Sequence, residues 1–344
     1  MEAGPAEGNL KTNLVGAASK GAFLNRFWIL ILCGLSLFVA ASGIPVTRAS
    51  AQVVEGDPVI AASGDIACDP GATNFKGGLG TSSVCRQKYT SDLLVNQSLA
   101  AVLPLGDNQY ECAGANAFSS SYGLSWGRVK DITHPVAGNH EYSTTGGTDC
   151  DSTGHAAGYF NYFGAAAGDP NKGYYSYDIG AWHVIALNTN CSKVGGCGAG
   201  KPEEVWLRND LANNPARCTL AYWHQPRFSS NLKSPSSASS TFWKDLYDGG
   251  ADVILNGHIH NYERFAPQTP AGAADPALGI REFVVGVGGR SAVSITSTAN
   301  APNSEIRGRT YGVLNLTLHP DSYDWKFVPE AGKTFSDSGS DQCH

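Results

Sequence analysis

The sequence lacks several features that would assign it to a specialised class of protein. Its 41 glycines follow no Gly-X-Y period, which excludes a collagen-like chain. Basic residues are outnumbered by acidic ones, 24 to 30, and no basic run dominates, so a nucleic acid held by its phosphates is not the expected partner. No internal repeat is present. Hydrophobic residues make up 42% of the 344 positions, which is enough for a sizeable core.

The first fifty residues have the order of a secretory leader. Basic residues precede an uncharged stretch from Phe27 to Val46, and the small-residue triplet Ala49-Ser50-Ala51 follows it. We expect a signal peptide over residues 1–51 and one domain over residues 52–344, secreted or extracytoplasmic and without stable membrane contact after cleavage. An uncleaved membrane anchor is the alternative, because an uncharged stretch of this length can just span a bilayer.

The cysteines favour disulfides over a metal site. No Cys-x-x-Cys is present, which disfavours a cysteine-based zinc site. Beyond the leader the sequence has these cysteines: Cys68, Cys85, Cys112, Cys150, Cys191, Cys197, Cys218 and Cys343. An even number in an exported protein indicates disulfides, although the spacing does not fix the pairing. Cys191 with Cys197, across a glycine-rich loop, is the easiest local pair.

Short apolar runs alternate with helical patterns along the chain. The runs that end in a polar or ionisable residue lie at 58–63, 100–105, 135–137, 219–223 and 253–255. Further strands are expected on either side of Gly180 within 174–187, and at 282–287, 311–318 and 323–328. Helices are expected at 83–97, 202–213 and 239–247. Uninterrupted apolar runs are typical of strands buried on both faces, and functional groups of α/β proteins gather at the carboxyl ends of such strands.

The residues at these strand ends suit metal ions. They are Asp65, Asp107, Tyr110, Asn139, His140, His224, His258 and His260. Carboxylate oxygen and imidazole nitrogen are ligands of first-row transition metals, and the set is too rich for one ion. A carboxylate such as Asp107 can bridge two cations about 3.5–4 Å apart. His258 and His260 can serve neighbouring ions only if Gly257 lets the chain turn sharply.

Three of these segments resemble the motifs of a known family. Gly106-Asp107-Asn108-Gln109-Tyr110 is similar to the GDxxY motif of purple acid phosphatases, and Gly138-Asn139-His140-Glu141 to their GNHE motif. Gly257 to Arg264 is similar to GHxHxYER, while Asp65 and His224 fill the first and fourth motif positions. The chain therefore resembles a calcineurin-like metallophosphoesterase of the purple acid phosphatase type. The resemblance implies a four-layer α-β-β-α sandwich of two mixed sheets flanked by helices.

The resemblance also implies a role for each residue. Asp65, Tyr110 and His260 would hold a first metal, Fe(3+), and Asn139, His224 and His258 a second, Fe(2+), Zn(2+) or Mn(2+). Asp107 would bridge the two ions, and His140 would act as general acid or hydrogen-bond donor at the leaving oxygen. Two cations make hydroxide available at mild pH and neutralise phosphoryl charge, so the expected reaction is attack of a metal-bound hydroxide.

The sequence departs from the family pattern where phosphate would bind. Family members often have further histidines after the fourth motif, whereas here Gln225-Pro226-Arg227-Phe228 follows His224 and no histidine occurs before Asn256. We therefore expect His140 and Arg227, the latter as an anion clamp, to contact substrate. Asn108 is a third candidate, although it is equally suited to forming a turn. Glu263 and Arg264 are interpreted as an ion pair that supports the loop of the last motif, and not as catalytic groups.

The expected function is that of a secreted, acid phosphatase-like enzyme that hydrolyses phosphate monoesters, with a small phosphorylated substrate. The alternative within the class is a phosphodiesterase acting on nucleotides or on lipid or wall phosphodiesters. A different class is a secreted binding protein on a metallophosphoesterase scaffold with little turnover. The sequence leaves the natural substrate, the second metal and the oligomeric state open.

Overall fold

The structure is a computed structural model that describes residues 56–232, 235–292 and 300–344. All of these residues belong to one unit, Val53–His344, when the chain is divided by its contacts. The expected signal peptide, residues 1–51, lies outside the described residues. Within the described ranges, no helix combines the length and the apolar character needed to cross a membrane.

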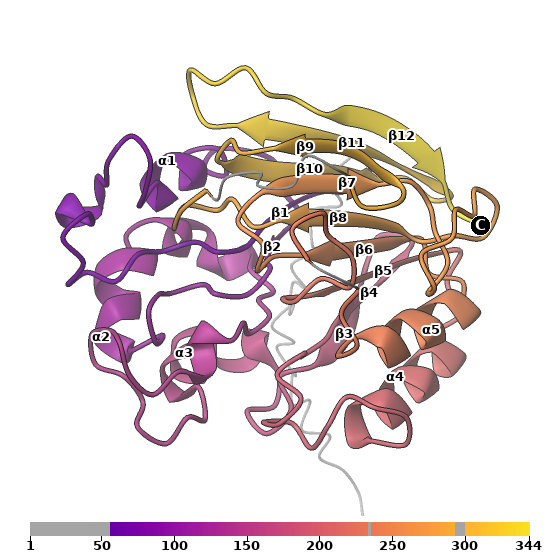
Figure 1. The fold of residues 1–344 in the computed structure, drawn as a ribbon, viewed down its shortest axis with the longest axis horizontal. Helices are drawn as coiled ribbons and strands as arrows, with labels where there is room; N and C mark the ends of the chain where they lie inside the picture. The colour runs from indigo at the N-terminus through magenta and orange to yellow at the C-terminus, as the bar shows by residue number, and fades with distance from the viewer. Residues whose placement is uncertain (1–55, 233–234, 293–299) are drawn as a thin grey trace, which may run out of the picture. The chain divides into compact units, whose positions relative to one another are not determined.

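A first sheet of five strands has the order β12-β11-β10-β1-β2 (Figure 1). Its strands are β1 (Val59–Ser63), β2 (Ala101–Pro104), β10 (Gly312–Leu318), β11 (Ser322–Pro329) and β12 (Ser338–Gln342). β1 and β2 are parallel, with Ile60 opposite Ala101, and the remaining neighbours are antiparallel. The carboxyl ends of β1 and β2 therefore lie side by side, directly before Asp65 and Asp107.

A second sheet of seven strands has the order β3-β4-β5-β6-β8-β7-β9. Its strands are β3 (Tyr175–Ile179), β4 (Trp182–Ala186), β5 (Cys218–Trp223), β6 (Val253–Asn256), β7 (Tyr262–Phe265), β8 (Arg281–Val285) and β9 (Ser304–Gly308). β4, β5, β6 and β8 run parallel to one another. The parallel centre of the sheet brings His224, after β5, next to the loop that follows β6.

The helices lie outside the two sheets. They are α1 (Gln87–Ser91), α2 (Ala115–Ala117), α3 (Ala157–Phe163), α4 (Pro202–Asn213) and α5 (Ser240–Asp248). Short helical turns of other types occur at Lys76–Gly78, Phe118–Tyr122, Trp126–Ile132, His140–Tyr142 and Gly164–Ala167. In Figure 1 the group α1 to α3 and the pair α4 and α5 lie on opposite sides of the strands.

The core consists of three apolar layers, which confirms the expected four-layer sandwich. Ile60 and Ala62 of β1 point into the layer between the sheets, whereas Ala61 packs with the aromatic residues around α2 and α3. The period-2 alternation of side chains along a strand produces this division. On the other sheet, Ile185 packs outward with Leu207 of α4 and the aromatic residues of α5. Each fully buried Ile or Leu side chain in these layers contributes about 1.5–3 kcal/mol.

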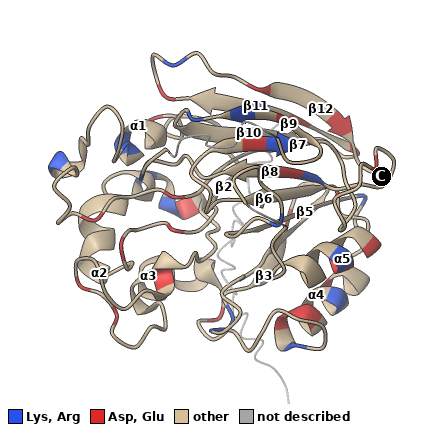
Figure 2. Ribbon diagram, viewed as in Figure 1, with Lys and Arg blue, Asp and Glu red and all other residues tan. Residues whose placement is uncertain are grey.

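Charged side chains of both signs occur along the outer helices (Figure 2). On α4 the Arg208 guanidinium lies 2.5 Å from Glu204, and on α5 Lys244 pairs with Asp248. Both pairs are separated by four residues, the spacing that brings side chains together on one helix face. These helices thus present paired charges outward and apolar side chains to the seven-stranded sheet.

The described residues contain four disulfides. The expected local pair, Cys191–Cys197, is present. The others are Cys68–Cys85, Cys112–Cys150 and Cys218–Cys343. The last of these joins the start of β5 to the residue before the carboxyl terminus, across a sequence separation of 125 residues.

Candidate metal centre

The candidate side chains come from loops that follow the parallel strands of both sheets. Asp65 follows β1, Asp107 follows β2, His224 follows β5 and His258 follows β6. The carboxyl ends of the two sheets meet at one end of the sandwich. The structure thereby brings together residues that are far apart in the sequence.

Left-handed backbone conformations direct three of these side chains toward the centre. The φ angles are 61° at Asp65, 48° at Asp107 and 67° at His258. Non-glycine residues rarely adopt this conformation, and such residues are concentrated at functional sites. The Ile259 N–H donates to the Gly257 carbonyl over 2.8 Å, which closes a three-residue turn around His258.

Gly257 contributes space rather than the turn that the sequence led us to expect. The positive φ falls on His258 and not on Gly257. A Cβ atom at Gly257 would lie 2.7 Å from the Leu105 carbonyl oxygen and 2.9 Å from Asp65 Oδ2. The glycine therefore allows the chain after β6 to pass directly against Asp65.

A first group of four donor atoms lies around the Tyr110 hydroxyl. This oxygen is 2.8 Å from Asp65 Oδ1, 3.0 Å from Asp107 Oδ2 and 3.0 Å from His260 Nε2. His260 Nε2 is in turn 2.9 Å from Asp65 Oδ1. One hydroxyl proton cannot satisfy three such neighbours. Ligands at right angles around an ion with bonds of about 2.0–2.2 Å would lie about 3 Å apart, as these atoms do.

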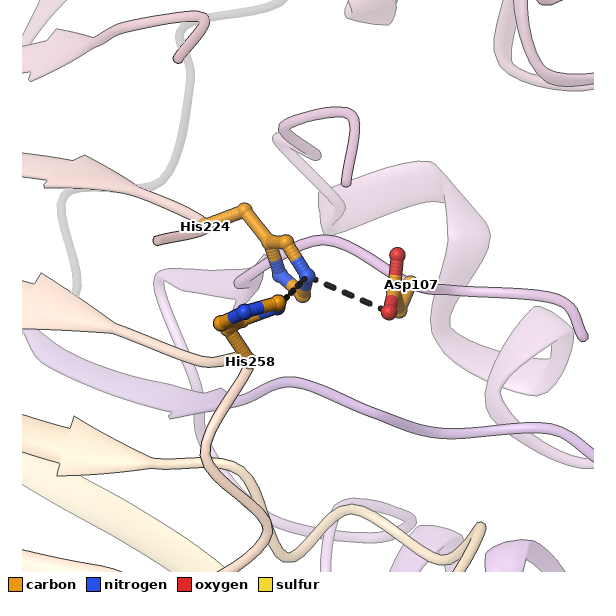
Figure 3. A group of neighbouring side chains, drawn as sticks. All are labelled: Asp107, His224 and His258. Carbon is orange, nitrogen blue, oxygen red and sulfur yellow. Dashed lines mark hydrogen bonds and ion pairs between the residues drawn. The ribbon is translucent and has the colours of Figure 1, made fainter. Parts of the chain in front are cut away.

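A second group of donor atoms lies around His224 Nε2. This nitrogen is 3.2 Å from Asp107 Oδ2, 3.2 Å from Asn139 Oδ1 and 3.3 Å from His258 Nδ1. Figure 3 shows the side chains of Asp107, His224 and His258 converging from three separate segments. Asp107 Oδ2 belongs to both groups, so a single carboxylate oxygen connects them.

The opposite atoms of these side chains are held by the protein. The backbone N–H of His258 donates to Asp65 Oδ2 over 2.7 Å, and that of His140 donates to Asp107 Oδ1 over 2.8 Å. His224 Nδ1 lies 2.8 Å from the Leu105 carbonyl, which makes Nδ1 the protonated nitrogen and leaves Nε2 facing the centre. These contacts orient the donor atoms toward the centre.

The electrostatic field favours positive charge at the second group. Burial alone would lower the pKa of His224, but the carboxylates of Asp107 and Asp65 raise it to about 9. Burial and the neighbouring His224 lower the pKa of His258 to about 4, which keeps that imidazole neutral. A metal ion supplies the positive charge that the two carboxylates favour, so the donor set fits the dinuclear centre that the sequence resemblance implies.

Glu141 holds the loops that carry the donor residues. The sequence assigned it no role beyond its place in a motif. Its buried carboxylate accepts backbone N–H groups from Gly138 at 2.6 Å, Asp107 at 2.9 Å and Asn108 at 2.8 Å. Burial, followed by the charge of Asp107, raises the pKa of Glu141 to about 7. One side chain thus ties the loop after β2 to the loop that carries Asn139.

A cavity of about 250 Å³ opens onto both donor groups. Its lining residues are Asp107, Tyr110, Glu111, Asn139, His140, His258, His260, Arg290 and Ser291. His140 Nδ1 lies 2.6 Å from the Glu111 carbonyl oxygen, so this nitrogen carries the proton. Its Nε2 is 4.0 Å from Asp107 Oδ2, on the side of the donor groups.

Two of the expected substrate contacts do not reach this cavity. Arg227 donates from its guanidinium to the carbonyl oxygens of Pro270 and Ser236, at 2.9 and 2.7 Å. Asn108 is buried, and its Nδ2 donates to the Val136 carbonyl over 2.9 Å. Both side chains are engaged in holding loops, and Arg290 is the arginine that lines the cavity. The structure thus gives neither Arg227 nor Asn108 a contact with the cavity.

The fold and these donor groups define a metallophosphoesterase-type protein. The chain belongs to the calcineurin-like phosphoesterase family, whose model matches residues 87–262. The matched segment includes Asp107, Tyr110, Asn139, His224 and both histidines after β6. The family implies a dinuclear metal centre at these strand ends.

Plant purple acid phosphatases are among its relatives. Purple acid phosphatase 15 of Arabidopsis thaliana is 29% identical over 104 residues, which cover 28% of this chain and 19% of that protein. Purple acid phosphatase 21 of the same plant is 29% identical over 153 residues, 42% of this chain and 34% of that protein. The chain thus spans about a fifth to a third of the length of these relatives.

Solved structures share the fold. The purple acid phosphatase PPD1 from yellow lupin (Lupinus luteus) seeds has a TM-score of 0.60 at 17% identity, covering 82% of this chain and 53% of that one. GAP50, described as the anchor in the inner membrane complex of Plasmodium, has a TM-score of 0.55 at 15% identity. The match covers 82% of this chain and 88% of that one. At these identities the likeness concerns the fold alone.

Proposed function

We propose that this chain is a dinuclear-metal phosphoesterase that hydrolyses phosphate monoesters. The observation that carries the proposal is the position of Asp107 Oδ2, which lies 3.0 Å from the Tyr110 hydroxyl and 3.2 Å from His224 Nε2. An oxygen common to two donor groups is what a pair of neighbouring cations requires. Family membership and the similarity to purple acid phosphatases support the same reaction class.

Each donor group would hold one ion. Asp65, Tyr110 and His260 would hold the first with Asp107, and Asn139, His224 and His258 the second with the same carboxylate. A phenolate is a hard, basic oxygen donor, so Tyr110 favours Fe(3+) in the first position. The mixed nitrogen and oxygen ligands of the second group suit Fe(2+), Zn(2+) or Mn(2+). When bound, the ions would activate water for attack and neutralise charge on the phosphoryl oxygens.

His140 would supply the proton that the leaving alkoxide needs. It lines the cavity, its side chain is 27% exposed, and its Nδ1 is fixed on the Glu111 carbonyl. The remaining nitrogen, Nε2, faces the donor groups and is free to exchange a proton with a bound ester. His140 is thus proposed as general acid, whereas Asp107 is proposed as the bridging ligand.

We further propose that the protein works outside the cytoplasm, with residues 1–51 as its signal peptide. The described residues contain four disulfides, which form and persist in oxidising compartments. The domain from residue 52 onward would then carry the complete donor set.

Elemental analysis of the purified protein, combined with hydrolysis of p-nitrophenyl phosphate, tests the proposal. We expect about two metal ions per chain, with iron near one, and a visible absorption band that Tyr110→Phe removes. Asp107→Asn should lose metal and activity together. His140→Gln should keep the metal and lose about 10²–10⁴-fold in kcat.

Asp169→Asn serves as the control for these variants, because Asp169 is an exposed residue bonded within its own turn. It should match the wild type in metal content and rate. A protein that binds no metal after it is supplied with iron, zinc and manganese would overturn the proposal. So would a loaded protein that hydrolyses neither monoesters nor diesters, and the binding-protein alternative would then be preferred.

A further inference from the structure

Arg290, which lies outside all of the motifs, gives the cavity a positive charge. It lines the cavity together with the donor residues, and its side chain is 28% exposed. Its guanidinium Nη2 lies 2.6 Å from Glu111 Oε1, and its centre lies 5.1 Å from the centre of the Tyr110 ring. The positive charge thus lies beside Tyr110, the centre of the first donor group.

The main chain holds Arg290 against the metal loops. Its N–H donates to the Asp65 carbonyl over 2.9 Å, and its own carbonyl accepts the N–H of Cys85 over 3.2 Å. The next residue, Ser291, has its hydroxyl 2.7 Å from His260 Nδ1. The base of the arginine side chain is therefore fixed relative to Asp65 and His260.

The Arg290 guanidinium retains unused hydrogen-bonding capacity. Its Nε is buried and has no hydrogen-bond partner among the described residues. A guanidinium has five N–H donors in a planar fork that matches the oxygens of phosphate. The ion pair with Glu111 uses the Nη2 side only. The side chain as a whole is 28% exposed and lines the cavity, so the exposed part of the guanidinium can receive an anionic oxygen.

Glu111 positions both His140 and Arg290 on the wall of the cavity. Its backbone carbonyl fixes His140 Nδ1 at 2.6 Å, and its carboxylate holds Arg290. The side chains of Glu111 and Arg290 are equally exposed, so their pair is solvated and can rearrange when a stronger anion arrives. A phosphoryl group with two negative charges is such an anion.

We propose that Arg290 binds a phosphoryl oxygen of the substrate and thereby makes the site select phosphate monoesters over diesters. This inference rests on the proposed function. A monoester has three non-bridging oxygens, whereas a diester has two. Two metal positions and one guanidinium together provide three places for such oxygens, and a diester leaves the guanidinium without one. Arg290 thus fills the role that the sequence reasoning gave to Arg227.

Steady-state kinetics of Arg290→Gln and Arg290→Lys test this inference. With p-nitrophenyl phosphate, kcat/KM of Arg290→Gln should fall about 10- to 100-fold, mostly through KM, since a hydrogen bond to a charged group is lost. With bis-p-nitrophenyl phosphate the change should stay below about 3-fold. Arg290→Lys should recover part of the loss, and Glu111→Gln should add little to Arg290→Gln in the double variant.

Arg128→Gln is the matched control. Arg128 Nη2 lies 2.6 Å from Asp92, its side chain is 33% exposed, and it does not line the cavity. It should leave the kinetics with both substrates unchanged. The metal content of every variant is measured. It should equal that of the wild type, because Arg290 provides none of the atoms proposed to ligate the metals.

Binding of inorganic phosphate to the metal-loaded protein, followed by calorimetry, separates this inference from the proposed function. Arg290→Gln should weaken that binding by a similar 10- to 100-fold factor even if the wild type hydrolyses neither ester. Unchanged phosphate binding, or equal losses with monoester and diester, would overturn the role of Arg290 and leave the phosphoesterase proposal standing.

Discussion

At Gly138 the main chain passes so close to Asp107 that a side chain cannot be accommodated. A Cβ atom there would lie 2.2 Å from Asp107 Oδ1 and 2.3 Å from the Asp107 backbone nitrogen. The Asp107 carboxylate is itself held by the His140 N–H, so it cannot move aside without losing that hydrogen bond. The position of the Asp107 carboxylate, and with it of Oδ2, thus depends on a residue that has no side chain.

Gly138→Ala should therefore displace Asp107. We expect the free energy of unfolding to fall by about 1–3 kcal/mol, as in other overpacked sites, and the metal content to fall with it. Gly198→Ala is the control, because a Cβ atom there meets nothing within 4 Å, and its effect should stay below about 1 kcal/mol. Urea denaturation and elemental analysis provide the two readouts, and a fully loaded Gly138→Ala variant would contradict this account of the site.

Sequence reasoning at the scale of residues found the donor types but not the contacts around them. The side chains from Asp65 to His260 that were grouped from the sequence do converge in the structure. This convergence could be predicted because strand ends and the order of motifs can be recognised in a sequence. Arg290 was missed because it follows a glycine-rich turn, and only the fold shows which arginine faces the cavity. The expected pair of Glu263 with Arg264 is wrong. Adjacent strand residues point to opposite faces, and Arg264 binds Asp337 instead.

At the scale of elements, His183 joins two strands and a helix. It lies on β4 directly opposite Asp178 of β3, and its Nδ1 is 2.9 Å from that carboxylate. Its Nε2 is 2.8 Å from Asp210 of α4, whose other oxygen accepts the Ser176 hydroxyl. Burial alone would lower the pKa of His183, but the hydrogen bonds and charges of Asp210 and Asp178 raise it above its ordinary value.

This contact should make stability depend on pH. Because the folded-state pKa of His183 is raised, its stabilisation is complete below the unfolded-state value, about 6.5, and is lost as the pH rises through the folded-state pKa. The difference in Tm between the wild type and His183→Gln should thus be largest below about pH 6.5 and should shrink as the pH rises above that value. His155→Gln, at an exposed position, is the control. A difference in Tm between the wild type and His183→Gln that stays constant as the pH rises would contradict the proposed charge pairing.

The elements themselves were predictable where one local signal dominates. The expected helix at 202–213 has the observed bounds of α4, since a proline and two glutamates mark its start. The expected helix at 83–97 is reduced to the short α1, because Cys85 has a φ of 61° and is tied to Cys68. The expected strand at 135–137 forms only a bridge from Val136 to Leu105. β7, β9 and β12 lack long apolar runs and were not foreseen.

At the scale of the whole molecule, the disulfide between Cys218 and Cys343 constrains the largest part of the chain. A disulfide stabilises the fold by restricting the unfolded chain, and the effect grows with the length of the closed loop. The separation of 125 residues corresponds to a stabilisation of about 5 kcal/mol, whereas the separation of 6 between Cys191 and Cys197 corresponds to about 2 kcal/mol. Replacing Cys218 and Cys343 with serine should therefore lower the free energy of unfolding more than replacing the other pair. Guanidinium denaturation of the two double variants measures the difference, and a reversed order would refute this ranking.

The two donor groups draw on residues from Asp65 to His260 and on both sheets, with Asp107 Oδ2 as the common atom. No single loop or pair of neighbouring elements contains the proposed metal centre. A growing or partly folded chain can hold a stray ion by single side chains, but it lacks the shared oxygen until the two sheets have docked. If the proposed function holds, hydrolytic competence would therefore arise late in the life of each molecule, and metal loading would mark the completion of its assembly.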